Sequence, residues 1–303
     1  MSGFSGVQMV GGYKETCRGG LERARGALEA LGVKIPSRKI LISLLPADLK
    51  KDGSQFDLPF AVCLMALIQK TSFVVDLKDW LFAAELGLNG RLRPVRGVVS
   101  YALCAMSQNL SGVVVAKSQL GELTSLMAAS DQGHSRIKVL GFDYLSEVFQ
   151  WLLSGCEKNT QPELPSSSIS GNESHKTCNF DDMILTDTMK KVAMAAMLGP
   201  HNLCLYGTPG TGKSMFAERL VSLSSGLEGE KKIEALKIHS LYHHHLSPKL
   251  LAGCPPFRNP HHQSSASAIL GSAEKPGELA LSHGGVLFLD ELPEFRRDLI
   301  EAC

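Results

Sequence analysis

The feature that most constrains the fold is a glycine-rich loop between a short apolar run and a helical pattern. Its residues are Gly207, Thr208, Pro209, Gly210, Thr211, Gly212, Lys213 and Ser214, which follow the pattern G-x-x-x-x-G-K-[ST]. Glycines let successive backbone N–H groups turn toward one anion. In such a loop the lysine reaches the β- and γ-phosphates, and the serine hydroxyl ligates Mg²⁺. The loop therefore predicts a nucleotide site, with ATP and Mg²⁺ as the expected ligands.

The sequence on both sides of the loop predicts the strand and the helix that such a site needs. The apolar run 202–206 is typical of a short buried strand. After the loop, Phe216, Leu220 and Leu223 recur at i, i+4 and i+7, which indicates one face of a helix, and 224–226 is a stop signal. The N-terminus of that helix would add its dipole to the anion site.

A second motif lies further along the chain, where the apolar run 286–289 is followed by Asp290 and Glu291. We expect a buried strand beside 202–206, with the acid pair at its carboxyl end, where ligands of such sheets collect. Asp290 is expected to bind Mg²⁺ through water, and Glu291 to polarise the attacking water as general base. By itself an apolar run ending in two acids is typical of any strand entering a turn. Together with the loop, it predicts a P-loop ATPase.

Composition and charge fit an ordinary globular chain. The 303 residues are 44% hydrophobic and 20% charged with a net charge of +1, and the length suggests two domains. This balance indicates no global field for nucleic acid or membrane. Arg93 and Arg96 are candidates for a local basic patch or for a solvated face. The longest apolar stretch, 58–68, is too short to cross a bilayer, so no membrane partner is expected.

The cysteines and the N-terminus bear on location. None of the eight cysteines forms a C-x-x-C pair, and Cys63, Cys104 and Cys204 lie in apolar runs, where we expect core thiols. This usage is typical of a reducing compartment. The first residues lack the basic segment and apolar run of a signal peptide. We therefore expect a cytoplasmic protein.

The organisation of the chain predicts two domains joined by a linker. Residues 155–177 are polar and rich in serine and proline, which favours a flexible linker over a long surface loop. In the first domain, 1–154, strand and helix patterns alternate, which predicts an α/β fold, and Asn89-Gly90 is a turn signal. The expected strands are 6–10, 39–44, 81–88, 112–115 and 137–140, and the expected helices are 20–31, 57–69, 98–107, 120–128 and 144–154.

Several further stretches resemble the YifB/ComM family of Mg-chelatase-like AAA+ ATPases. In the second domain, 178–303, these stretches are 256–262, 276–278, 283–285 and 292–295, and in the first domain they are 46–49 and 56–59. The resemblance covers essentially the whole chain in order. It implies an N-terminal domain of the ribosomal-S5-domain-2-like fold, similar to the Lon proteolytic domain, followed by part of a P-loop AAA+ module.

The resemblance also implies a function. Family members look like hexameric, ATP-driven motors that act on branched DNA during uptake and recombination, so a second copy of the chain and DNA are the expected partners. Residues 269–279 would form a hairpin that is inserted in the second AAA+ helix and points toward the pore. In place of the family's glycine-rich tip this chain has 271–274, Gly-Ser-Ala-Glu, which leaves the role of the tip open.

The resemblance further implies a chain that is truncated at both ends, as in a gene fragment, a frameshifted copy or a partial sequence. A first strand would precede Met1, and the sensors, arginine finger, helical lid and C-terminal domain would follow Cys303. An arginine finger contributes roughly 10³–10⁵ in turnover in related NTPases, and a lid excludes water. We therefore expect nucleotide binding with poor hydrolysis.

Other functions remain open at this level. One alternative is a remnant that binds nucleotide or a partner without turnover. Another is a magnesium chelatase subunit, which the expected Lon-like domain argues against. The resemblance to the Lon proteolytic domain raises a protease as a further alternative, whose Ser-Lys dyad would need a serine near Gly53 and a lysine two residues after Gly97. Ser54 is close to the first position, but Val99 occupies the second, and a serine without a base is no nucleophile.

The histidines allow a metal interpretation and a contact interpretation. His239 and His243, at i and i+4, could share a helix face and bind a metal, although no cysteine or carboxylate is placed to complete the set. His261 and His262, beside Arg258 in a family-matching stretch, are candidates for interface or DNA contacts. A structural hydrogen-bonding role is an equal alternative.

Overall fold

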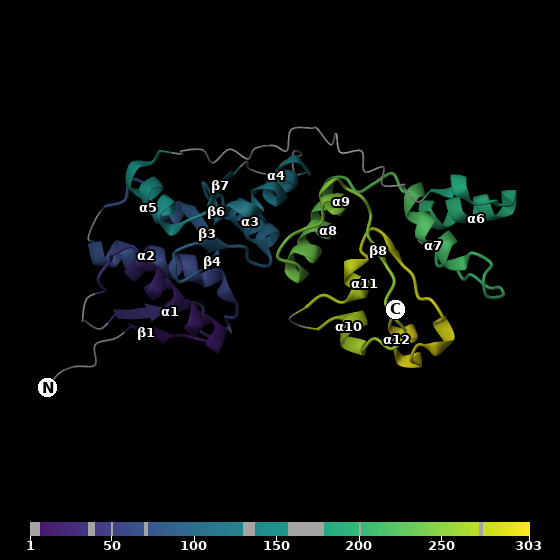
Figure 1. Cartoon of the computed structure of the whole chain (residues 1–303), viewed down its shortest axis with the longest axis horizontal. Coiled ribbons are helices and arrows are strands. Elements are labelled where there is room, and N and C mark those ends of the chain that lie inside the picture. Colours follow the sequence, from purple (N-terminus) through teal and green to yellow (C-terminus); the bar gives the residue numbers. More distant parts are fainter. Residues whose placement is uncertain are drawn as a thin grey trace. The chain divides into compact units, whose positions relative to one another are not determined.

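The chain folds into a mixed α/β structure in two compact units, Met1–Glu163 and Leu164–Cys303, which are described one at a time (Figure 1). The computed structural model describes residues 7–35, 40–49, 51–69, 72–129, 137–156, 179–199, 201–272 and 275–303. The division between the units lies within 155–177, and residues 157–177 of the predicted linker lie outside the described residues.

The first unit is built around a three-stranded parallel sheet. Its strands are β3 (Trp80–Ala83), β6 (Gly112–Ala116) and β7 (Lys138–Phe142), with β6 in the middle. Every residue of β6 is buried, as expected for a central parallel strand that is covered on both faces. The connecting helices are α3 (Val98–Ser107) and α4 (Leu120–Ala129).

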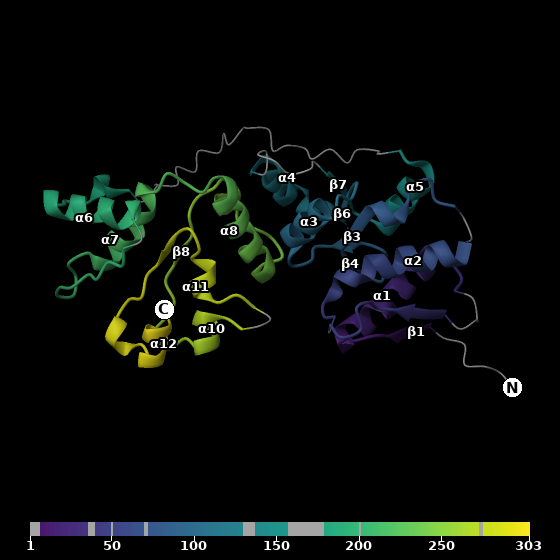
Figure 2. The same cartoon turned by 180° about the vertical axis from the view of Figure 1, so that it is seen from behind.

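A second parallel pair, β1 (Val7–Val10) with β2 (Ile40–Ser43), belongs to the same unit. Helix α1 (Glu15–Ala30) connects the two strands, and its buried positions recur at helical spacing, which gives it one apolar face. Figure 1 and Figure 2 show α1 lying beside α2 (Asp57–Gln69), and the two helices share one hydrophobic core. Helix α5 (Leu145–Ser154) completes that core through Trp151, whose ring lies 4.7 Å from that of Trp80.

The expected strands and helices of this unit are confirmed, two helices (57–69 and 98–107) with the predicted ends and the others with ends moved by up to five residues. The predicted strand 81–88 is divided, because Glu85–Leu86 (β4) turns back at Asn89-Gly90 and pairs antiparallel with Leu92–Arg93 (β5). Gly90 has a positive φ of 77°, and its N–H donates to the Gly87 carbonyl at 2.9 Å. The predicted turn is therefore confirmed, whereas β5 was not predicted because two residues carry no periodicity.

The second unit consists mainly of short elements. Its helices are η4 (Phe180–Asp182), α6 (Asp187–Leu198), α7 (Lys213–Leu220), η5 (Val221–Leu223), α8 (Gly229–Tyr242), α9 (Pro248–Leu251), α10 (Ala266–Leu270), α11 (Glu278–Leu281), η6 (Leu292–Glu294) and α12 (Arg297–Ala302). Strands β8 (Phe257–Arg258) and β9 (Val286–Leu287) pair in parallel, Phe257 with Val286 and Arg258 with Leu287. Among the helices in the described ranges, none combines the length and the apolar character needed to cross a membrane.

The predicted strand 202–206 has no ladder in the structure. Its side chains alternate between half-buried and exposed, as in an extended chain, and Leu203 and Leu205 pack in a small core with Phe216 and Val286. The expected neighbour, 286–289, pairs with β8 instead and is half-buried rather than buried. A strand is defined by its hydrogen-bonded neighbour, and within the described ranges this segment has none.

The three cysteines expected in the core lie at the surface. Cys63 and Cys104 in the first unit and Cys204 in the second are exposed, so the prediction of core thiols is wrong. Each of these cysteines lies in an apolar run that is longer than the face of the segment that packs against the core. Some residues of each run therefore point outward, and the cysteine is one of them.

The approach of β8 to β9 depends on one glycine. Gly285 precedes β9 where the Val286 N–H donates to the Pro256 carbonyl at 2.9 Å. A Cβ atom at Gly285 would overlap that carbonyl. The close approach of the two strands therefore requires glycine at this position.

Candidate nucleotide-binding site

The 207–214 loop carries the extended segment directly into helix α7. Gly210 and Gly212 have φ values of 81° and 84°, in the left-handed region that favours glycine. Gly212 is the N-cap of α7, and Lys213 is its first residue. The loop therefore turns on two glycines and ends at a helix N-terminus, where unpaired N–H groups and the helix dipole favour an anion.

The side chains of the loop are held by its own carbonyl groups. The Lys213 ammonium donates to the carbonyl oxygens of Gly207 at 3.0 Å and Thr208 at 2.9 Å. The Thr211 hydroxyl donates to the same Thr208 carbonyl at 2.9 Å. A phosphate oxygen is a stronger acceptor for an ammonium group than a neutral carbonyl. The lysine is thus kept at the loop by bonds that an anionic ligand could replace.

The second motif meets the loop through one hydrogen bond. The Ser214 hydroxyl donates to Asp290 Oδ2 at 3.1 Å, although the two residues are 76 positions apart. Asp290 Oδ1 accepts the Glu291 N–H at 3.0 Å. Mg²⁺ prefers hard oxygen ligands and takes one or two from protein, with phosphates and water supplying the others. The hydroxyl and the carboxylate therefore fit a Mg²⁺–nucleotide complex.

Glu291 is held in an unusual conformation beside a histidine. Its φ is 57°, in the left-handed region that non-glycine residues seldom adopt. Its Oε2 lies 3.2 Å from Nδ1 of His262, and the glutamate side chain is 66% exposed. Sequence reasoning did not predict this pair. The structure brings the two together because His262 follows β8 and Glu291 follows β9, and the carboxyl ends of these parallel neighbours meet at one edge.

Arg258, a candidate for DNA contact, is engaged inside the unit. Its guanidinium binds the Glu278 carboxylate of α11 through two bonds, Nη2 to Oε1 at 2.7 Å and a shorter one from Nε to Oε2. The Glu278 carboxylate raises the pKa of the Arg258 guanidinium above its usual value. Both side chains are mostly buried, so Arg258 connects β8 to α11.

Helix α7 is anchored from beneath by Arg219. This side chain, 7% exposed, binds both oxygens of the Asp182 carboxylate at 2.7 and 2.6 Å and also the Asn179 and Met215 carbonyls. One helical turn earlier, the Phe216 ring packs edge-on against Phe180 at 5.2 Å. The position of the loop therefore depends on η4 through one ion pair and one aromatic contact.

His239, the first residue of the predicted metal pair, forms a hydrogen bond inside the unit. His239 is buried on α8, and its Nε2 lies 2.9 Å from the Leu281 carbonyl, with the His243 ring stacked 6.2 Å away. Burial lowers the pKa of His239 below its usual value. Within the described ranges, no three metal-ligating side chains gather, so the metal interpretation has no support there.

The predicted hairpin 269–279 corresponds to a tight turn between two short helices. Gly271 and Pro276 form an antiparallel bridge, and the Ser272 N–H donates to the Lys275 carbonyl at 2.8 Å. Residues 273–274, at the tip, lie outside the described residues. The turn separates α10 from α11, and its insertion in an AAA+ helix stays a prediction.

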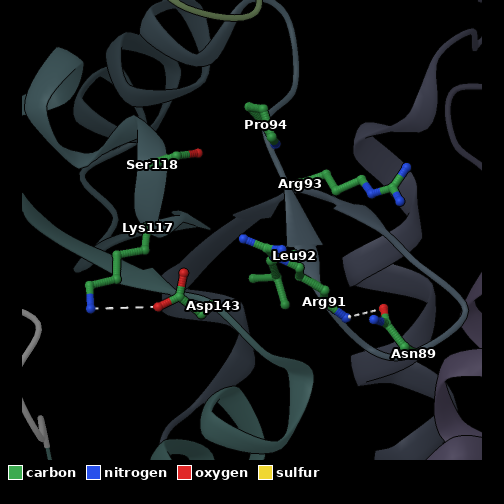
Figure 3. Close-up of a pocket in the computed structure, with 8 residues that line it drawn as sticks. All are labelled: Asn89, Arg91, Leu92, Arg93, Pro94, Lys117, Ser118 and Asp143. Atoms are coloured by element: carbon green, nitrogen blue, oxygen red, sulfur yellow. Dashed lines mark hydrogen bonds and ion pairs between the residues drawn. The ribbon is translucent and has the colours of Figure 1, made fainter.

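The first unit carries a basic pocket of about 270 Å³ at the carboxyl ends of β6 and β7 (Figure 3). Lys117 is paired with Asp143 at 3.5 Å, and Arg93, which Figure 3 shows directed away from Lys117, is paired with Glu85 at 3.8 Å. The lining is Asn89, Arg91, Leu92, Arg93, Pro94, Lys117, Ser118 and Asp143. Carboxylates therefore engage two of the three cations that line this pocket.

Two family models match the chain in succession. "Subunit ChlI of Mg-chelatase" matches residues 1–119, and "Magnesium chelatase, subunit ChlI" matches residues 179–303. The second match contains the whole loop, Asp290 and Glu291.

Relatives from several bacteria match nearly the whole chain. Competence protein ComM of Haemophilus influenzae is 35% identical over 304 residues, which cover 99% of this chain and 57% of that protein. YifB of Escherichia coli is 35% identical over 302 residues, covering 99% and 56%. Rv2897c of Mycobacterium tuberculosis is 33% identical over 311 residues, covering 99% and 58%. The chain thus spans about half the length of the curated relatives it matches.

Proposed function

The chain belongs to the Mg-chelatase-like family of ComM and YifB, and on that premise we propose that its second unit binds ATP with Mg²⁺ and carries the groups that act in its hydrolysis, with full turnover belonging to the whole protein. One observation carries the proposal: the hydrogen bond between Ser214 and Asp290. It brings together the glycine loop and the acid pair, which are 76 positions apart and are the two parts that a Mg²⁺–nucleotide site needs. The loop, a hydroxyl, a carboxylate and a candidate general base then lie in one place.

The residues would act in the following way. The loop N–H groups and the start of α7 hold the phosphates, and Lys213 exchanges the carbonyls of Gly207 and Thr208 for phosphate oxygens. Ser214 and Asp290 would hold Mg²⁺, which when bound neutralises charge on the phosphoryl group. Glu291 accepts a hydrogen bond from the attacking water and orients it toward the γ-phosphate.

Finer parts of the proposal follow from the family resemblance. We propose that the first unit has the Lon-like, S5-domain-2-like fold, that copies of the chain assemble in a ring, and that the assembly acts on branched DNA in the cytoplasm. ComM is named a competence protein, which supports a role in DNA uptake. The turn between α10 and α11, in the 269–279 segment, is the proposed contact with DNA in the pore.

Titration with a fluorescent ATP analogue tests the binding step. Lys213→Ala removes a charge-assisted contact worth about 3 kcal/mol, so affinity should fall by roughly 100-fold. Ser214→Ala should weaken binding only when Mg²⁺ is present. The matched control is Lys249→Ala, an exposed lysine on α9 of the same unit, which should leave affinity unchanged. If Lys213→Ala binds as tightly as the wild type, the assignment of the loop is wrong.

Steady-state phosphate release tests the catalytic step. Glu291→Gln keeps the size of the side chain but removes its basicity, so turnover should be abolished while the analogue still binds. Binding without release by the wild type would favour the non-hydrolysing alternative. Undiminished release by Glu291→Gln would show that Glu291 is not the base.

A further inference from the structure

The contact between His262 and Glu291 has a role beyond holding the fold. We propose that His262 is the positioning residue that orients Glu291 toward the attacking water, an inference that rests on the proposed ATPase function. The contact joins Nδ1 of His262 to Oε2 of Glu291 at 3.2 Å. The imidazole therefore takes one carboxylate oxygen and leaves the other for a water molecule.

His262 is well placed because its ring is fixed on several sides. The β8–β9 ladder brings the segments that follow the two strands side by side, and the Phe288 N–H extends that pairing by donating to the Arg258 carbonyl at 2.8 Å. The His262 ring packs edge-on against Phe295 at 6.4 Å and lies 4.2 Å from the His261 ring. Its side chain is only 24% exposed.

Glu291 requires such a partner because only its backbone is otherwise fixed. The N–H of Glu291 donates to Asp290 Oδ1, and its carbonyl accepts the Glu294 N–H at 2.8 Å. The side chain is 66% exposed, so without a partner it would sample several rotamers. A general base must stay within hydrogen-bond reach of the water that it activates. The contact with His262 favours one orientation in advance.

The proposed role sets a requirement on the imidazole. A carboxylate accepts hydrogen bonds but donates none, so to hold Glu291 by a hydrogen bond His262 has to present a proton on Nδ1. A carboxylate offers about four lone-pair sites, so this bond leaves Oε1 free to accept from water. The arrangement is the general one in which a base is oriented by a third group.

Kinetics with three variants separates positioning from a structural role. His262→Ala should lower kcat by about tenfold, since loss of orientation at a reacting group costs one to two orders of magnitude, while KM and analogue affinity stay within about twofold. His262→Asn, whose amide can donate from the place of Nδ1, should recover most of that loss. The matched control is His283→Ala, which breaks another His–Glu contact, with Glu234 at 2.9 Å, and should leave kcat unchanged. An unchanged or increased kcat in His262→Ala, or no recovery in His262→Asn, overturns the proposal.

A second measurement tests the role of His262 even if the chain does not hydrolyse ATP. In ¹⁵N-histidine NMR of the whole chain at about pH 8, where most imidazoles are neutral, His262 should carry its proton on Nδ1. In Glu291→Ala that preference should disappear. A proton on Nε2 in the wild type, or no change in Glu291→Ala, overturns the inference. Failure of analogue binding would instead overturn the proposed function and leave this readout intact.

Discussion

The two units differ in what holds their segments together. In the first unit the parallel strands β3, β6 and β7 are paired along their length, and the central strand is buried throughout. In the second unit the ladder in the described ranges has two pairs, Phe257 with Val286 and Arg258 with Leu287. Its distant segments meet mainly through side chains, such as Ser214 with Asp290 and Arg219 with Asp182.

This difference between strand pairing and side-chain contacts determines how each unit can respond to a ligand. A sheet resists displacement as a whole, because each strand is held by several hydrogen bonds and by packing on both faces. Contacts between single side chains can be replaced one at a time by contacts with a ligand. The hydrogen bonds of Lys213 and Ser214 are contacts of that kind. The unit with the weaker backbone framework is therefore the one suited to rearrange around a nucleotide, and we expect the units to unfold separately.

The largest effect on stability should come from a cavity made in the core of the first unit. Leu64 on α2 is 1% exposed, so Leu64→Ala should lower the free energy of unfolding of this unit by about 3 kcal/mol through lost packing and a residual cavity. Calorimetry of the full chain should show one transition shifted down and the other unchanged. Leu67→Ala on the same helix, at a position 59% exposed, is the control and should change little. A shift of both transitions would contradict independent units.

A smaller effect should follow from removing the anchor beneath α7. Arg219→Met keeps much of the buried side-chain volume but loses the Asp182 pair and two carbonyl contacts. Because Asp182 is 54% exposed and stays hydrated, we expect a loss of about 2 kcal/mol in the second unit rather than the full cost of an unpaired buried charge.

The control for that prediction is an arginine–carboxylate pair on the surface. Arg297→Met breaks the contact with Glu301 at 2.8 Å, but the arginine is 92% exposed, so the effect should be below about 0.5 kcal/mol. Equal losses in the Arg219 and Arg297 variants, measured by denaturant unfolding, would show that burial does not distinguish the two pairs.

The smallest effect should be a pH dependence confined to the second unit. Burial lowers the pKa of His239 below its ordinary 6.5, so the unfolded chain takes up a proton there before the folded chain does. The second unit should therefore lose stability as the pH falls through 6.5 toward the folded pKa, by about 1.4 kcal/mol for each pH unit between the two pKa values. Below the folded pKa this residue should cause no further loss. His239→Gln should flatten that part of the profile, and an identical profile in wild type and variant would contradict the assignment.

The sequence predicted those parts of the molecule whose residues carry a periodic hydrophobic pattern or a turn signal. The helices of the first unit, the strands 112–115 and 137–140, and the Asn89-Gly90 turn each carry a local signal, and each is present. The predicted strand 202–206 was wrong, because a short apolar run is compatible with an extended chain but does not show whether another segment lies beside it.

The site was predictable in its motifs but not in its contacts. The loop pattern defines Gly207 to Ser214 by sequence alone, and an apolar run marks Asp290 and Glu291. The partners of these residues come from elsewhere in the chain: His262 meets Glu291 only through the pairing of β8 with β9, and Arg258 is engaged by Glu278 of α11. Such pairs depend on register, which no local pattern in the two short strands reveals.

Gly285 makes the site vulnerable at a position that takes no part in its chemistry. The backbone there passes so close to the Pro256 carbonyl that one added methyl group would act as a wedge between β8 and β9. Separating those strands would carry His262 away from Glu291 while every residue of the phosphate loop and of the acid pair remained unchanged. A homologue with a larger residue at this position would keep every motif of the site in its sequence. It would nevertheless lack the contact between His262 and Glu291.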